Sequence, residues 1–149
     1  MKNIYAILIS LTMMTTVSAH EGGHGELEEG GKFGGVTAPI VDSSEAGKGN
    51  KAKFIYKAEL VRAESGKLSL YVFDHKMKLI DLSALGNEIE AKLEVKKKGK
   101  FTYVGAFKLT KHGNHFMGQL PKIDYKPFNI DFFLMKGQQK LFVGFSNLD

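Results

Sequence analysis

The strongest constraint on the fold is a series of short runs of β-forming residues, separated by turn residues, that begins at Lys53. The expected strands cover residues 54–63, 68–74, 77–82, 88–95, 101–111, 115–120, 128–135 and 140–145. Only residues 83–92 could form a helix instead, because no segment carries a long helical repeat. We therefore predict an all-β protein, an antiparallel β-sandwich of the immunoglobulin-like type, with a small β-barrel as the alternative.

Two connections between these strands can be predicted from their residues. The sequence Glu-Ser-Gly-Lys at residues 64–67 is typical of a hairpin connection. Pro121 and Pro127 bracket residues 122–126, and proline cannot donate a hydrogen bond within a sheet. We expect this second segment to be a loop that crosses between sheets or lies at an edge.

The first 19 residues have the three parts of a secretory signal peptide. Lys2 gives the positive start, residues 4–14 form the apolar region, and Val17-Ser18-Ala19 is a small-residue cleavage pattern. We expect cleavage after Ala19 and export to the periplasm or the outside of the cell. No later run reaches the roughly 18 to 20 apolar residues of a membrane helix, so no transmembrane span is expected in the mature chain.

Removal of residues 1–19 leaves 149 − 19 = 130 residues, enough for one domain. Nine of the 17 glycines fall in residues 20–50, and such a composition favours a mobile leader. One early strand is possible within this leader, around the apolar residues Phe33, Val36, Ile40 and Val41. Residues 51–149 are then a single β-sandwich domain. It has no cysteine, so its fold must rest on a hydrophobic core.

The positive charge comes almost entirely from lysine, because Arg62 is the only arginine among 21 basic residues. After loss of Lys2 the mature chain has a net charge of 20 − 16 = +4. Proteins that read nucleic-acid bases use arginine forks, so we expect no nucleic-acid partner. The basic run at residues 96–100 indicates a solvated hairpin tip, or a contact with anionic lipid.

The new N-terminus is the first candidate metal site. Residues 20–24, His-Glu-Gly-Gly-His, match the zinc-protease pattern H-E-x-x-H, but their glycines oppose the helix that this motif needs. After cleavage, the free amine and the imidazole of His20 could instead chelate Cu(II), Ni(II) or Zn(II), with His24 within reach. The alternative is a polar leader that binds no metal.

A second candidate site lies at a predicted hairpin. His112 and His115 flank the dipeptide Gly-Asn, which favours a two-residue turn and would place the two Cβ atoms about 5 Å apart. Leu109 and Phe116 then face the core, so Met117 shares the outer face with both histidines. Two imidazoles and a thioether suit copper. The alternative is an exposed polar hairpin tip, and a change of register by one residue would separate the set.

Two resemblances to known families also indicate metal handling. Gly34-Gly35-Val36, Ala58-Glu59-Leu60-Val61 and residues 67–75 together resemble the small β-domains that accompany bacterial heavy-metal efflux adaptors. Those domains commonly carry a histidine before the paired glycines, where this chain has Phe33. The mature terminus also resembles that of periplasmic copper-resistance carriers, which are immunoglobulin-like sandwiches, and His20 is the residue that carries over. These resemblances imply metal handling with an efflux or envelope protein as partner.

The sequence thus predicts an exported, non-enzymatic protein that binds or carries a transition metal, with copper as the first candidate. The G-x-S-x-G, P-loop and catalytic cysteine signatures do not occur in the chain. One alternative is an envelope interaction protein that binds a protein partner or an anionic surface, with incidental histidines. Another is a copper enzyme with an N-terminal histidine brace. The candidate metal ligands are His20, His24, His112, His115 and Met117, with His75 ranked lower.

Overall fold

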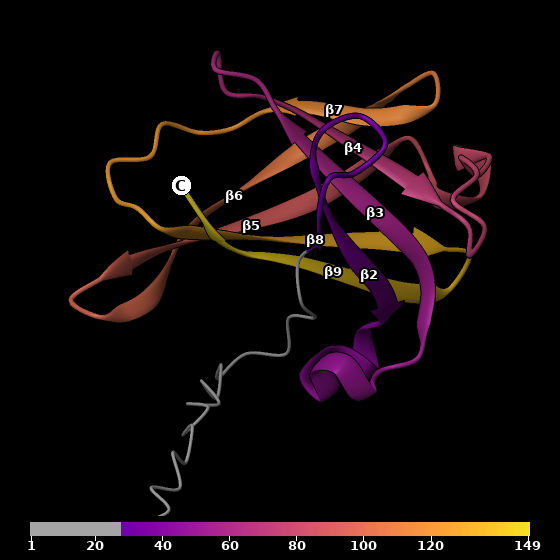
Figure 1. Ribbon diagram of the computed structural model, residues 1–149, viewed down its shortest axis with the longest axis horizontal. Coiled ribbons are helices and arrows are strands. Elements are labelled where there is room, and N and C mark those ends of the chain that lie inside the picture. The colour runs from indigo at the N-terminus through magenta and orange to yellow at the C-terminus, as the bar shows by residue number, and fades with distance from the viewer. Residues whose placement is uncertain (1–27) are drawn as a thin grey trace, which may run out of the picture.

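The computed structural model describes residues 28–149, which form one antiparallel sheet of nine strands with two short 3₁₀ segments (Figure 1). The elements in chain order are β1 (Glu28–Glu29), β2 (Val36–Asp42), η1 (Ser43–Lys51), β3 (Phe54–Arg62), β4 (Lys67–Phe73), η2 (Leu82–Leu85), β5 (Glu88–Lys97), β6 (Lys100–His112), β7 (His115–Gln119), β8 (Phe128–Lys136) and β9 (Gln139–Leu148).

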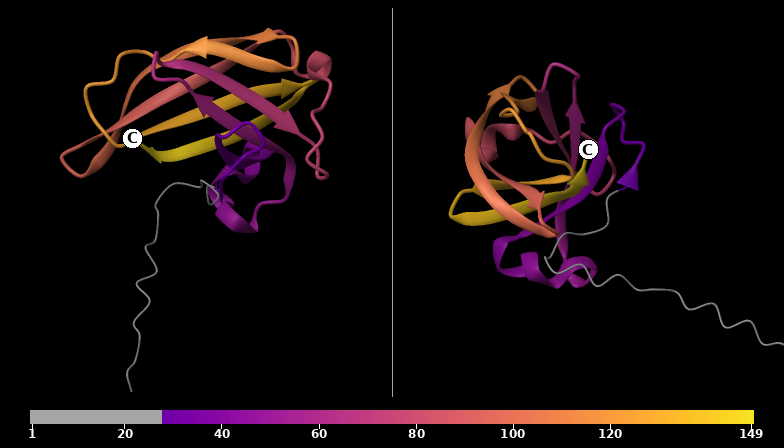
Figure 2. Two further views of the ribbon diagram at one scale, coloured as in Figure 1. Left: turned by 45° about the horizontal axis from the view of Figure 1, so that its top comes forward. Right: turned by 90° about the vertical axis from the view of Figure 1, so that its left-hand side faces the viewer.

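The sheet closes on itself into a barrel. Its strand order is β1-β2-β3-β4-β7-β6-β5-β8-β9, and β2 also pairs with β9 at Val41↔Phe142 and Asp42↔Leu141. Strands β2 to β9 therefore form a closed eight-stranded antiparallel barrel, which Figure 2 shows from two further directions. An immunoglobulin-like sandwich needs two separate sheets, so that first expectation is not confirmed. The alternative, a small β-barrel, is confirmed.

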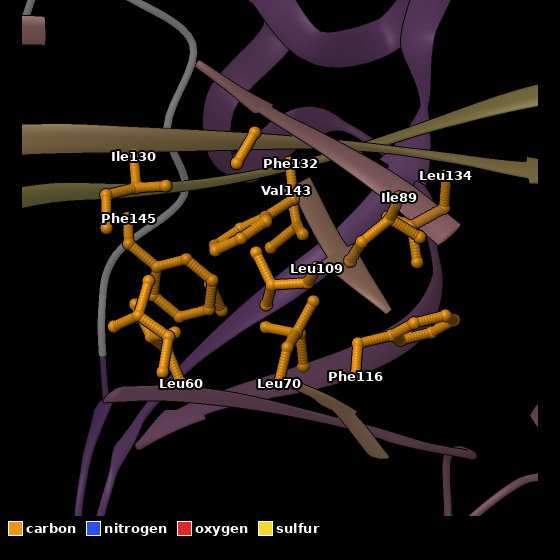
Figure 3. Close-up of a cluster of buried hydrophobic side chains, with 14 of the residues drawn as sticks. Leu60, Leu70, Ile89, Leu109, Phe116, Ile130, Phe132, Leu134, Val143 and Phe145 are labelled. Carbon is orange, nitrogen blue, oxygen red and sulfur yellow. The ribbon is translucent and has the colours of Figure 1, made fainter. Parts of the chain in front are cut away.

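Alternating side chains fill the barrel. Along β5, for example, Ile89, Ala91, Leu93 and Val95 are buried, whereas most of the residues between them face solvent. Figure 3 shows leucine, isoleucine, valine and phenylalanine side chains from several strands meeting in the interior. A barrel of eight strands is just wide enough for its own side chains. Its interior is therefore a core, and functional sites must be sought on its outer face and at its ends.

One predicted strand does not form. Residues 77–82 make only an isolated bridge, Phe73↔Leu79. The carboxylate of Asp74 accepts hydrogen bonds from the backbone N–H groups of Lys76 and Lys78, and these bonds hold the chain in a turn. The helical alternative for residues 83–92 also fails, because the chain makes only the short η2 segment before entering β5.

The early strand that was expected within the leader forms as β2 (Val36–Asp42). It pairs with β3 and β9, so the barrel includes residues before 51, where the domain was expected to begin. The proline-bracketed loop joins β7 to β8, which are not neighbours in the sheet, so it crosses one end of the barrel (Figure 1). Residues 1–19 lie outside the described residues. Among residues 28–149, no helix is both long and apolar enough to cross a membrane.

Candidate metal site on the outer face of the barrel

The turn between β6 and β7 brings two histidines opposite each other. The register of this hairpin is Thr110↔Met117, Lys111↔Phe116 and His112↔His115. Gly113 has a φ of 60°, and a glycine with positive φ at the first central position is the requirement of a type II′ turn. The predicted pairing of the two histidines is therefore confirmed.

The same hairpin fixes the side of the sheet on which each residue lies. Leu109 and Phe116 are fully buried in the core. Because side chains alternate along a strand, His112, His115 and Met117 lie together on the outer face. His112 is exposed, whereas His115 and Met117 are half-buried.

His115 lies in the most restricted environment of the three. Its ring stacks on Tyr71 of β4, with ring centroids 4.9 Å apart and 25° between the planes. Its Nδ1 atom lies 3.2 Å from Oδ1 of Asn114, which can only accept a hydrogen bond, so Nδ1 donates and Nε2 keeps its lone pair. Burial lowers the pKa of His115, and the nearby His112 and Lys67 lower it further. A neutral imidazole with a free Nε2 is the form that binds metals.

An aromatic ladder continues from His115 across the sheet. Phe33 stacks on Tyr71 with ring centroids 4.1 Å apart. Phe33 donates its N–H to Glu59 of β3 and His115 belongs to β7, so Tyr71 on the intervening strand β4 contacts one ring from each side. A side chain at position 33 is thus separated from the histidine pair by one aromatic ring. Sequence reasoning missed this ladder, and its only signal was the pair of aromatic residues on the outer face of β4.

Next to the ladder, a glycine-rich turn covers a buried carboxylate. Glu59 of β3 is fully buried although it points outward, and its Oε1 accepts hydrogen bonds from the backbone N–H groups of Phe33 (2.7 Å) and Gly35 (2.9 Å). Its Oε2 has no hydrogen-bond partner among the described residues. A Cβ atom added to Gly31 would lie 2.3 Å from Cδ of Glu59. The glycines therefore let the turn lie directly on this carboxylate.

The remaining predicted ligands do not join the histidine pair. The ring of His75 packs against Phe54, with centroids 4.6 Å apart. His20 and His24 lie outside the described residues. Within residues 28–149, no group of three or more histidine, aspartate and glutamate side chains gathers as a metal site. What the structure brings together is the set His112, His115 and Met117.

A cavity of about 750 Å³ opens at the other end of the barrel, where β7 and β3 end and β8 begins. Its walls include Arg62, Leu120, Ile123 and Phe128. The Arg62 guanidinium lies 5.5 Å from the ring centre of Phe128 and donates to the backbone carbonyl oxygen of Asp149. This cavity and the histidine pair are thus separate features.

No protein-family model, no curated protein and no solved structure matches the chain.

Proposed function

We propose that this protein binds a transition-metal ion, with copper as the first candidate, through His112 and His115, and that it carries or buffers the ion without catalysing a reaction. The pairing of these two residues across a two-residue turn supports the proposal. Cβ atoms of directly opposed residues lie about 5 Å apart, and metal–imidazole bonds are about 2 Å long. Both rings can therefore turn toward one ion.

Met117 favours copper over harder metals. It follows His115 by two residues on the same outer face and is half-buried. Its thioether is a soft ligand that selects Cu(I), whereas imidazole also suits Zn(II) and Ni(II). His20 and His24 would form a second, separate site. This second site depends on cleavage of the predicted signal peptide, which makes His20 the N-terminal residue. On the same prediction, we propose that the carrier acts in the periplasm or outside the cell.

The test is a competitive copper titration of the chain that begins at His20. We expect the double variant His112→Ala with His115→Ala to lose one binding step, and His75→Ala, the control for loss of a surface histidine, to keep it. Acetylation of the N-terminus should remove only the step that depends on His20. Unchanged copper affinity and stoichiometry in the double variant would overturn the proposal, and an unchanged titration after acetylation would rule out the separate site at His20.

The oxidation state of the ion gives a sharper readout. We expect Met117→Leu, a substitution of similar volume, to weaken Cu(I) binding while leaving Cu(II) binding nearly unchanged, because only the softer ion prefers sulfur. Equal losses for both ions would point to a change in the hairpin itself. The far-UV spectrum and the thermal midpoint of the variant distinguish these two results.

A further inference from the structure

The hairpin formed by β5 and β6 projects beyond the rest of the barrel. Strand β7 pairs with β6 only over residues 110–112, and the β8 pairing with β5 ends at Val95↔Phe128. One more hydrogen bond, from Lys96 N–H to the carbonyl oxygen of Pro127, ties the hairpin to the β7–β8 loop. Beyond that bond the hairpin extends away from the barrel, as Figures 1 and 2 show.

This end of the molecule is strongly basic. We call residues 96–104 and 121–127 the basic–aromatic tip. The only acidic residue in it is Asp124, whose carboxylate lies 4.0 Å from the Lys122 ammonium, with both side chains largely exposed. The lysines of the tip are Lys96, Lys97, Lys98, Lys100, Lys122 and Lys126.

Exposed aromatic rings lie among these lysines. Tyr103 is 57% exposed and Tyr125 is 50% exposed. The Lys97 ammonium lies 4.6 Å from the ring centre of Tyr125, and the Lys96 ammonium lies 5.9 Å from that of Phe101. Because Lys96 and Lys97 alternate in direction, aromatic rings lie on both faces of the hairpin. The linear sequence hides this arrangement, since Tyr125 belongs to a different loop.

We propose that the basic–aromatic tip docks on the surface of an anionic phospholipid bilayer. Each lysine near an anionic membrane surface raises the membrane-binding affinity by about fivefold. Tyrosine rings are enriched at the depth of the lipid headgroups. A narrow projection with rings on both faces fits end-on entry into this layer. Nucleic acid and carboxylate-rich proteins are recognised more often by arginine forks, and the tip contains no arginine.

The docked orientation keeps the two ends of the molecule apart. Strand β6 runs from the tip at Lys100 to the candidate metal site at His112. A barrel held on a bilayer by its tip would therefore present the histidine hairpin toward the aqueous side. The docking proposal does not rest on metal binding, so either proposal can fail without the other.

The test is cosedimentation with two kinds of vesicle, phosphatidylethanolamine containing phosphatidylglycerol, and pure phosphatidylcholine. We expect retention on the anionic vesicles only, and release at high salt, because the screening length falls from about 10 Å at 0.1 M to about 3 Å at 1 M. Replacing Lys96, Lys97, Lys98 and Lys100 by glutamine should weaken partitioning at least tenfold. Tyr103→Ser with Tyr125→Ser should weaken it several-fold even at low salt.

A matched control removes the same charge elsewhere. Replacing the exposed lysines Lys51, Lys53, Lys76 and Lys78 by glutamine changes the net charge equally without touching the tip, and should change partitioning by less than about threefold. Equal losses in the two quadruple variants would overturn the proposal, since net charge alone would then explain retention. It would also be overturned by no retention on anionic vesicles, or by tighter binding to a DNA duplex than to these vesicles.

Discussion

At the scale of single residues, Asp131 is a carboxyl whose ionisation is strongly disturbed by burial. It lies on the outer face of β8, paired with Lys92 of β5. Burial raises the pKa of Asp131 from 3.8 to about 7, the negative charge of Glu94 adds to the rise, and Lys92 opposes it. The folded protein therefore holds a proton on this carboxyl at pH values where the unfolded chain has released it.

This difference gives a pH dependence of stability with a definite sign. Between about pH 4 and pH 7 the folded state binds more protons than the unfolded state, so the contribution of Asp131 to stability falls as the pH rises. We expect Asp131→Asn to be more stable than the natural chain at pH 8, by on the order of 1–3 kcal/mol, with the gap closing near pH 4. Urea unfolding of both proteins at pH 4, 6 and 8 measures this difference in the free energy of unfolding. Asp124→Asn, an exposed control, should show no such trend, and a gap independent of pH for Asp131→Asn would contradict the expectation.

At the scale of elements, the glycine-rich turn over β3 depends on contact with one side chain. Gly31 has no room for a Cβ because the buried Glu59 carboxylate lies beneath it. We expect Gly31→Ala to lower the free energy of unfolding by about 1–3 kcal/mol, as overpacking does elsewhere. Gly47→Ala in η1 is the control, because nothing lies within 4 Å of its added Cβ, and it should stay within about 0.5 kcal/mol.

A double-mutant cycle identifies the cause of that loss. If the clash is with the carboxylate, Gly31→Ala should lower the free energy of unfolding by less in a Glu59→Ala background than in the natural chain. Urea unfolding of all four proteins measures the difference between these two decreases. Additive effects, or equal costs for the two glycine variants, would show that the carboxylate is not the obstacle.

These elements also show which local structures could be predicted from the sequence. The β6–β7 hairpin was predicted with its register, because a glycine between two β-forming runs fixes the turn locally. The turn over β3 was not, because its hydrogen bonds reach Glu59 from residues 24 and 26 positions away. The strand expected at residues 77–82 does not form, because the carboxylate of Asp74 accepts hydrogen bonds from the backbone N–H groups of the following turn.

At the scale of the whole molecule, the sequence indicated an all-β fold but could not choose between barrel and sandwich. Alternating residues predict one buried face per strand in either architecture. The choice depends on pairing between β2 and β9, about 100 residues apart, which no local pattern specifies. The candidate site was likewise predictable only in its local part, the histidine hairpin. Its aromatic neighbours and the basic–aromatic tip arise from segments that meet only in the fold.

The seam between β2 and β9 contains a carboxylate that joins the two strands. Asp42 accepts hydrogen bonds from the N–H (3.0 Å) and the hydroxyl (2.6 Å) of Ser44, and from the side-chain amide of Gln139 at 2.9 Å. The hydroxyl of Ser44, then Gln139, then the Ser44 N–H lower the pKa of Asp42 to about 2. The same carboxylate therefore caps the start of η1 and links the end of β2 to the beginning of β9.

We accordingly expect Asp42→Ala to loosen barrel closure more than the core. Amide hydrogen exchange in β2 and the first half of β9 should become several-fold faster, while exchange in β5 should change little, because local opening follows local hydrogen bonding. Asp81→Ala removes a similar cap, on η2, but no link between strands, and should leave the seam unchanged. In the natural chain the stabilising effect of Asp42 is present above about pH 4 and is lost as the pH falls toward 2. If both aspartate variants loosened the seam equally, closure would depend on the strand pairing alone and the Asp42 link would be incidental.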